Sequence, residues 1–131
     1  MSKYLIDTNV LIDILRGKCN FEKVSKFENP SISVITLSEL YYGAEKSKSA
    51  EKSIAWIDRL VEQLNLKVLS YDYETSKVFA NIKANLEKNG EKLEDFDLMI
   101  ASTAICNNQI LITGNIKHFG RVESLRIINS K

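Results

Sequence analysis

Short apolar runs alternate along the chain with longer stretches in which apolar residues recur every three or four positions. A short run bounded by polar or turn-forming residues is typical of a buried strand, and a period near 3.6 is typical of an amphipathic helix. The short runs predict strands at residues 4–6, 31–35, 66–69 and 110–113, and an edge strand at 125–128. The periodic stretches predict helices at residues 10–15, 36–44, 51–64, 73–89 and 97–106.

Turn-forming and capping residues mark several ends of these elements. Pro30 forces a break before the second strand, and Gly17 and Gly90 are expected to end the helices before them. Asp72 is expected to cap the helix that follows it. Strands and helices that alternate in this way predict an α/β protein. Right-handed crossovers would join four or five parallel strands into the middle layer of a three-layer α/β/α structure.

The composition is that of one globular domain covering residues 1–131. The chain is 44% hydrophobic and 27% charged, which excludes a wholly disordered protein, and it contains no internal repeats. Its 18 Lys and Arg against 17 Asp and Glu give a net charge of +1. That balance excludes a strongly basic nucleic-acid-binding protein but leaves room for a local basic face.

The cysteines and the apolar windows indicate where the protein works. Cys19 and Cys106 lie far apart in the chain and near no pair of histidines, so neither a zinc site nor a disulfide framework is expected. A reducing cytoplasm suits such a chain. No signal peptide is visible, and no apolar window approaches the length of a membrane span. We therefore expect a cytoplasmic protein without a membrane partner.

Polar residues stand where the predicted strands end. Asp7 directly follows the first strand, Glu39 lies one helical turn after the second, and Asn115 follows the fourth. Asp97 begins the helix that leads into the fourth strand. Because the carboxyl ends of parallel strands meet at one edge of a sheet, these side chains are expected to converge there. A structural interpretation is also open for each acid. Asp7 and Asp97 could stabilise helix N-termini, and Glu39 could complete a capping box that begins at Thr36.

The convergence of three acids favours a metal site. Three carboxylates without matching Lys or Arg side chains would repel one another, and Mg²⁺ or Mn²⁺ relieves that repulsion by taking oxygen ligands. Such an ion supports phosphodiester hydrolysis, because it polarises a phosphoryl oxygen and lowers the pKa of a bound water. The sequence has one His and lacks the Gly-x-Ser-x-Gly, Gly-x-Gly-x-x-Gly and Walker A motifs, so the corresponding hydrolase, dinucleotide and P-loop chemistries are not expected.

Four segments resemble, in the same order, the motifs of PIN-domain ribonucleases. They lie at residues 5–12, 33–44, 96–101 and 113–119. Their spacing and the length of the chain are most similar to the VapC toxins of prokaryotic toxin–antitoxin modules. The resemblance implies a Rossmann-like PIN fold and an Mg²⁺-dependent endoribonuclease. It also implies a homodimer and a small VapB-type antitoxin whose carboxy-terminal tail lies in the active-site groove.

The same resemblance implies roles for individual residues. Asp7, Glu39 and Asp97 fall on the acidic positions of the family, with Asp7 and Asp97 as the direct metal ligands. The hydroxyl of Thr8 or Thr113 is expected to support them, since hydrogen bonds to ligating carboxylates fix their orientation.

The chain departs from the family pattern after the fourth strand. Many members carry an acid there, whereas this chain has Asn115 in one candidate position and His118 in the other. An Asn adds no charge, which favours one tightly held ion over two. His118 is expected either to contact the scissile phosphate or to be a structural residue, and Arg16 either to contact phosphate or antitoxin or to be an ordinary surface residue.

Two other functions stay open at this point: a non-cleaving PIN-like module that binds RNA or protein, and an Mg²⁺-dependent small-molecule phosphatase. The near-neutral net charge is compatible with an RNA substrate, because three of the acids belong to the predicted metal site. In addition, residues 110–131 carry four Lys or Arg against one Glu. These counts predict an enzyme that grips few phosphates and has a modest salt dependence.

Overall fold

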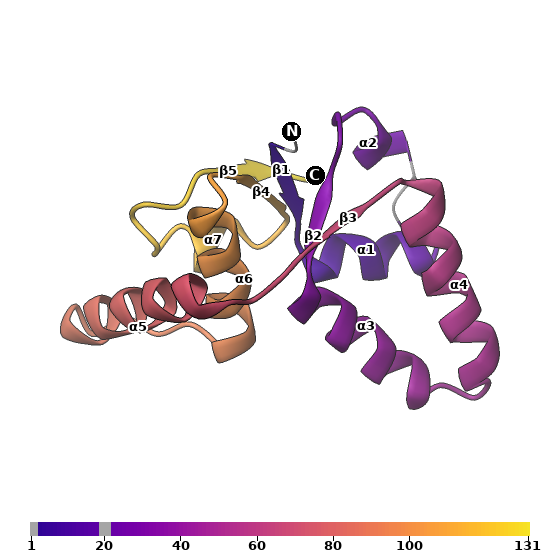
Figure 1. Ribbon diagram of the computed structural model, residues 1–131, viewed down its shortest axis with the longest axis horizontal. Helices are drawn as coiled ribbons and strands as arrows, with labels where there is room; N and C mark the ends of the chain where they lie inside the picture. The colour runs from indigo at the N-terminus through magenta and orange to yellow at the C-terminus, as the bar shows by residue number, and fades with distance from the viewer. Residues whose placement is uncertain (1–2, 19–21) are drawn as a thin grey trace.

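Five parallel strands form one sheet in the order β3-β2-β1-β4-β5 (Figure 1). The computed structural model describes residues 3–18 and 22–131. The strands are β1 (Tyr4–Ile6), β2 (Ser31–Ser33), β3 (Lys67–Leu69), β4 (Ile110–Thr113) and β5 (Ile127–Asn129). Crossover segments join all of them, so the predicted parallel α/β sheet is confirmed, with five strands.

Helices cover both faces of this sheet. They are α1 (Thr8–Leu15), α2 (Glu22–Ser25), α3 (Val34–Glu45), α4 (Ala50–Gln63), α5 (Tyr73–Lys88), α6 (Asp95–Cys106) and α7 (Ile116–Phe119). Figure 1 shows α5, α6 and α7 on one side of the sheet and α1, α3 and α4 on the other. The three-layer arrangement follows the sequence prediction.

The alternation of strand side chains divides the core into two halves. Leu5 and its neighbour Leu111 face α5 and α6, whereas Ile6 and its neighbour Ile112 face α1, α3 and α4. All four side chains are at most 1% exposed. Because both faces are buried, the central strands are apolar at successive positions, and this explains why short continuous apolar runs identified them.

The second strand is shorter than predicted. It ends at Ser33, and Val34 and Ile35 belong to α3 rather than to a strand. The hydroxyl of Ser33 accepts a hydrogen bond from the Ile35 backbone N–H at 3.0 Å, which caps the helix and stops the extended chain. Serine and apolar residues alternate from Ser31 to Val34, and Ile35 extends the apolar pattern, so the hydrophobic pattern alone misplaced this boundary.

The other boundaries agree with the sequence to within about two residues. Asp72 caps α5 by accepting from the Thr75 N–H at 3.0 Å, as predicted. Gly17 and Gly90 follow α1 and α5 with φ of 73° and 70°, the left-handed conformation that glycine adopts without strain. The short helices α2 and α7 were not predicted. Cys19 lies outside the described residues, and Cys106 is an exposed free thiol.

The order of the strands determines where polar residues gather. β1 and β4 are neighbours at the centre, and the chain leaves them in opposite directions along the sheet, toward β2 and toward β5. Such a point leaves a crevice beyond the carboxyl ends of the two strands. Asp7 and Asn115 lie at this crevice, just after β1 and one residue beyond Gly114 after β4. Within the described ranges, no helix is long and apolar enough to cross a membrane.

Candidate active site

Asp7 is a buried carboxylate held from the neighbouring strand. It is 1% exposed and occupies the N-cap position of α1, but its side chain makes no capping hydrogen bond. Instead, Thr113 Oγ1 at the end of β4 donates to Asp7 Oδ2 at 2.8 Å. The same hydroxyl accepts from the Asn115 backbone N–H at 2.9 Å, so Thr113 joins Asp7 to the segment after β4. The capping interpretation of the Asp7 side chain is therefore wrong.

The surroundings of Asp7 disfavour its charge. No Lys or Arg in the described part of the chain forms an ion pair with it. Its pKa is raised from the ordinary value of 3.8 to about 6, mainly because burial removes water from the carboxylate. The charges of Asp97 and Glu39 act in the same direction, and the hydrogen bond from Thr113 opposes them. A bound cation would relieve this unfavourable environment.

Glu39 is positioned from α1. Thr8 Oγ1 lies 2.8 Å from Glu39 Oε1 and 2.9 Å from Thr36 Oγ1. A hydroxyl has one proton, so with Glu39 ionised Thr8 donates to the carboxylate and accepts from the Thr36 hydroxyl. The predicted capping box is wrong, because α3 begins at Val34 and Thr36 is fully buried within it. Glu39 therefore stands in the second turn of α3, where the Thr8 hydroxyl directs its carboxylate.

Asp97 approaches from the other side of the sheet, in the first turn of α6. It is half-buried, and its pKa is raised first by burial and then by the charges of Glu39 and Glu94, while His118 lowers it. Asp7 and Asp97 each respond to the charge of Glu39, and Asp7 responds to Asp97. The three acids that the sequence placed at one edge of the sheet thus lie in one electrostatic neighbourhood.

A cleft of about 890 Å³ opens beside these acids, between α5, α6 and α7. Glu39, Asp97 and Asn115 line it together with His118. His118 Nδ1 lies 2.5 Å from Asn115 Oδ1, so a hydrogen bond joins the imidazole to the amide at the N-terminal end of α7. His118 therefore contacts a neighbouring residue, Asn115, as the structural interpretation expects. Its side chain is also exposed to the cleft, so a contact with a bound phosphate stays open. Arg16 lines a different groove, beside Trp56 and Leu15.

Comparison with known proteins identifies the family. The family model described as PIN domain matches residues 4–125. The chain is 38% identical to ribonuclease VapC2 of Haemophilus influenzae, over 98% of each chain. It is 34% identical to the tRNA(fMet)-specific endonuclease VapC of Salmonella typhimurium, over 97% of each. This chain is a PIN-domain ribonuclease of the VapC family.

Solved structures agree with that assignment. The DNA-bound VapBC complex from Salmonella typhimurium contains a chain that superposes with a TM-score of 0.90 and 32% identity, over 100% of both chains. A promoter-DNA complex of VapBC2 from Rickettsia felis gives a TM-score of 0.86 and 30% identity, over 96% of this chain and 97% of that one. The PIN fold inferred from the motifs is confirmed.

PIN-domain ribonucleases are in general dependent on a divalent metal ion. Within residues 3–18 and 22–131, no group of three or more His, Cys, Asp or Glu side chains is arranged to hold one ion. Mg²⁺, however, is bound by proteins through one or two carboxylates and keeps several of its waters. The buried Asp7 and the half-buried Asp97 could supply that donor set, since burial raises the pKa of each carboxylate and a cation would offset that effect. The residues therefore fit one hydrated ion better than a fully protein-enclosed one.

Several contacts around the candidate site have no local sequence signal. Thr36 supports Thr8 across 28 positions. In the cleft, Lys83 pairs with Asp95 at 2.9 Å, and Arg121 Nη1 donates to the Lys92 carbonyl at 2.6 Å. These contacts join α5 to α6 and the segment before α6 to the segment after α7, so only the packing of those elements reveals them.

Proposed function

We propose that this PIN-domain protein is a metal-dependent endoribonuclease that acts as the toxin of a VapBC-type pair. The observation that carries the proposal is Asp7, a fully buried carboxylate without a cationic partner among the described residues, beside two further acids at the crevice of the sheet. Burial of a charge in this way costs stability, and such a cost is typical of a site built for a ligand of opposite charge.

In this proposal Asp7 and Asp97 hold one divalent ion, Mg²⁺ or Mn²⁺. When bound, such an ion polarises a phosphoryl oxygen of RNA and lowers the pKa of a bound water toward neutrality. Thr113 keeps Asp7 Oδ2 oriented through its 2.8 Å hydrogen bond. Burial raises the pKa of both carboxylates, for Asp7 to about 6, so protons compete with the metal for these oxygens as the pH falls.

Glu39 and Asn115 complete the proposed site. Thr8 occupies Glu39 Oε1, which leaves Oε2 to accept a hydrogen bond, or a proton, from the attacking water. The amide oxygen of Asn115 is hydrogen-bonded to His118 Nδ1, so the NH₂ group of Asn115 is the part that can donate to the RNA. Neither role requires a fourth acid.

The proposed partners follow from the relatives. Two solved neighbours are VapBC complexes bound to DNA, which supports a VapB-type antitoxin as the partner of this chain. The homodimer that the resemblance to VapC toxins implies is proposed with it. Two relatives at 34% and 36% identity are named tRNA(fMet)-specific endonucleases, which makes an initiator tRNA the first substrate to test. We propose that the protein acts in the cytoplasm, where tRNA is found.

The test is cleavage of labelled RNA by the purified protein. We expect cleavage with Mg²⁺ or Mn²⁺, none with EDTA, and none for Asp7→Asn or Asp97→Asn. Glu62→Gln, which changes an exposed carboxylate on α4, is the matched control and should cleave as the parent does. Cleavage that survives both Asp substitutions would overturn the site. Metal-independent RNA binding without turnover would indicate a non-cleaving module, and turnover of small phosphate esters alone would indicate a phosphatase.

A further inference from the structure

A second pocket opens on the other side of Asn115 from the acidic cleft. It has a volume of about 490 Å³ and lies between the start of α1, the end of β4 and the residues after β5. Among the described residues of its lining, Val10 is the only large apolar one. The polar lining residues are Asn9, Asp13, Lys18, Asn115, Ser130 and Lys131. A pocket lined in this way suits a polar, charged ligand rather than an apolar one.

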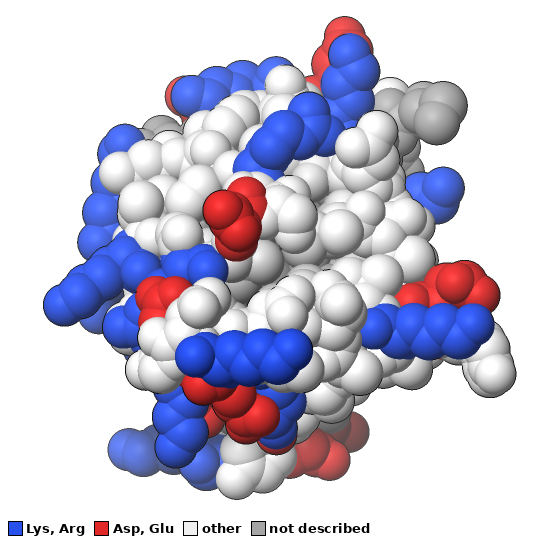
Figure 2. Space-filling model, turned by 90° about the vertical axis from the view of Figure 1, so that its left-hand side faces the viewer, with Lys and Arg blue, Asp and Glu red and all other residues white. Residues whose placement is uncertain are grey.

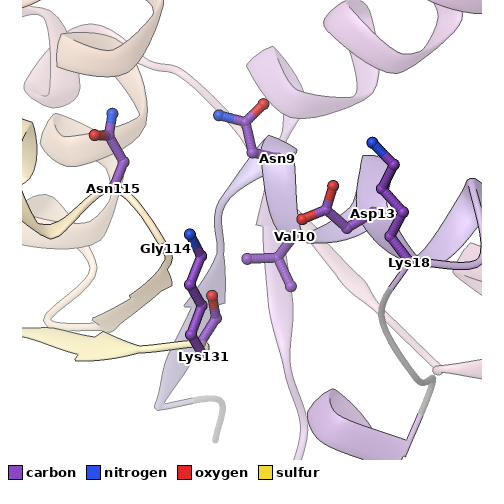
Figure 3. Close-up of a pocket in the computed structure, with 8 residues that line it drawn as sticks. Asn9, Val10, Asp13, Lys18, Gly114, Asn115 and Lys131 are labelled. Carbon is purple, nitrogen blue, oxygen red and sulfur yellow. The ribbon is translucent and has the colours of Figure 1, made fainter.

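Two lysines stand at opposite sides of this pocket. Figure 3 shows Lys131 rising from beyond β5 beside Gly114, Lys18 on the far side, and Asn9 between them. Within the part of the chain that the structure describes, neither ammonium group has an ion-pair or hydrogen-bond partner. Among the described lining residues, these two ammonium groups stand against one side-chain carboxylate, that of Asp13.

Gly114 makes room for one of these lysines. A Cβ atom at this position would lie 3.1 Å from Lys131 Cε and 3.3 Å from Ser130 Oγ. The stem of Lys131 therefore packs directly over the backbone that leaves β4, one residue before Asn115. Any larger residue at 114 would push the Lys131 stem away from the crevice.

The acidic cleft has the opposite charge. Six carboxylates line it against three Lys or Arg side chains: Glu39, Glu87, Glu91, Glu94, Asp95 and Asp97 against Lys83, Lys92 and Arg121. Two of the cations are already engaged, since Lys83 pairs with Asp95 and Arg121 donates to a carbonyl. On the molecular face that α5, α6 and α7 cover, Lys and Arg side chains are interspersed with Asp and Glu (Figure 2). A chain of phosphates is therefore stabilised better in the lysine pocket than in this cleft.

The two cavities meet at one residue. Asn115 lines both, and its backbone N–H is held by Thr113, which also holds Asp7. Asn9, in the lysine pocket, stands two residues after Asp7 in the first turn of α1. A single strand whose scissile phosphate lies at the acids would therefore enter the lysine pocket with its next nucleotides.

We propose that this lysine pocket binds the RNA backbone on one side of the cleaved bond, with Lys18 and Lys131 each contacting a phosphate. Asn9 offers an amide to a neighbouring base or ribose. The proposal rests on the proposed ribonuclease function and adds to it the site that grips the substrate. A ligand grip of two lysines also explains how a chain of net charge +1 handles a polyanion: it contacts few phosphates.

The test compares Lys18→Ala, Lys131→Ala and the double variant with the parent protein. With Mn²⁺ and a labelled RNA, we expect each single change to raise KM roughly three- to tenfold and to leave kcat within about twofold, because the lysines bind phosphate and do not touch the reacting atoms. In EDTA, where no cleavage occurs, fluorescence anisotropy with a labelled decauridylate should show the same loss of affinity. The slope of log K against log salt should fall by about 0.7 per lysine.

Lys77→Ala is the matched control, since Lys77 is an exposed lysine on α5 that lines neither cavity. If Lys18→Ala and Lys131→Ala bind and cleave as Lys77→Ala does, the proposal is overturned. Weaker binding of a purified antitoxin with unchanged KM for RNA would also overturn it, because the pocket would then belong to the protein partner. If the parent fails to cleave but the lysine variants lose affinity for decauridylate, the pocket stands and the proposed ribonuclease function fails.

Discussion

Neutralising Asp7 should stabilise the metal-free protein while it destroys the activity. Asp7 is 1% exposed, has no cationic partner among the described residues, and carries a pKa raised to about 6. A carboxylate whose pKa is higher in the folded than in the unfolded chain lowers the stability of the fold as pH rises through the two values. Asn keeps the shape and an oxygen that can accept from Thr113, but it cannot be charged. Asp7→Asn should therefore remove the penalty.

The magnitude follows from the two pKa values. The shift from 3.8 to about 6 is about two units, and each unit corresponds to about 1.4 kcal/mol. The penalty is fully present above pH 6, where it is about 3 kcal/mol, falls to about 1.6 kcal/mol at pH 5, and is about 0.5 kcal/mol at pH 4, where Asp7 is mostly protonated in the folded protein. For a chain of this size, 3 kcal/mol corresponds to a change in Tm of roughly 10 °C.

The assay is urea or thermal unfolding of both proteins in EDTA between pH 4 and pH 8. We expect Asp7→Asn to be the more stable protein at pH 8 and the difference to disappear toward pH 4. Glu62→Gln changes an exposed carboxylate on α4 to the same amide and should follow the parent at every pH. Added Mn²⁺ should stabilise the parent and leave Asp7→Asn unchanged, because only a protein that binds the ion gains from it.

Two results would refute the reasoning. If Asp7→Asn is no more stable than the parent at pH 8 in EDTA, the buried charge of Asp7 does not lower the free energy of unfolding as its surroundings indicate. If the stability difference does not change between pH 8 and pH 4, titration of Asp7 is not its source. In either case a metal would not be needed to balance this group.

Three further substitutions test the groups around Asp7. Thr113→Val removes the donor to Asp7 Oδ2, and we expect Mn²⁺ affinity in calorimetric titrations to fall about 10- to 100-fold; Thr113→Ser should restore it, and an unchanged affinity would remove Thr113 from the site. Thr8→Val leaves Glu39 without its directing hydroxyl, so kcat should fall by about tenfold while Tm changes by only a few degrees. A large fall in Tm together with the fall in kcat would indicate a structural role for Thr8. Asn115→Asp adds a carboxylate, and the Mn²⁺ concentration for half-maximal cleavage should fall several-fold; no change would mean that residue 115 lies beyond the reach of the ion.

Local patterns were sufficient for the five strands and the five longer helices, because each of them carries its own period, but not for the short helices α2 and α7. β1 and β4 are buried on both faces, so their sequences are short apolar runs. Asp72 and Gly90 mark the two ends of α5 to within a few residues. One boundary was also misplaced, at Ser33. Its hydroxyl caps α3 and ends β2 inside a stretch whose strand-like pattern continues to Ile35, so a side-chain hydrogen bond marks a boundary that hydrophobicity does not.

In the candidate site, the position of the acids could be predicted from the sequence, but their hydrogen-bond partners could not. That acids gather at one edge of the sheet could be predicted, because the carboxyl ends of parallel strands must coincide. The partners of those acids could not, because they come from distant parts of the chain: Thr113 reaches Asp7 across 106 positions and Thr8 reaches Glu39 across 31. Only the pairing of β1 with β4 brings Thr113 to Asp7, and only the packing of α1 on α3 brings Thr8 to Glu39.

The charges of the protein show most clearly what a sequence can and cannot specify. The amino-acid sequence specifies the total charge, 18 basic against 17 acidic residues, together with the α/β class and the acids of the crevice. The distribution of these charges depends on the tertiary structure: acids gather in the cleft of α5, α6 and α7, and two lysines without an ion-pair partner among the described residues line the pocket beyond Asn115. The reason is that the period of a helix or strand is a property of neighbouring residues. The field at a site, in contrast, is summed over every charge that folding brings near it, whatever its position in the chain.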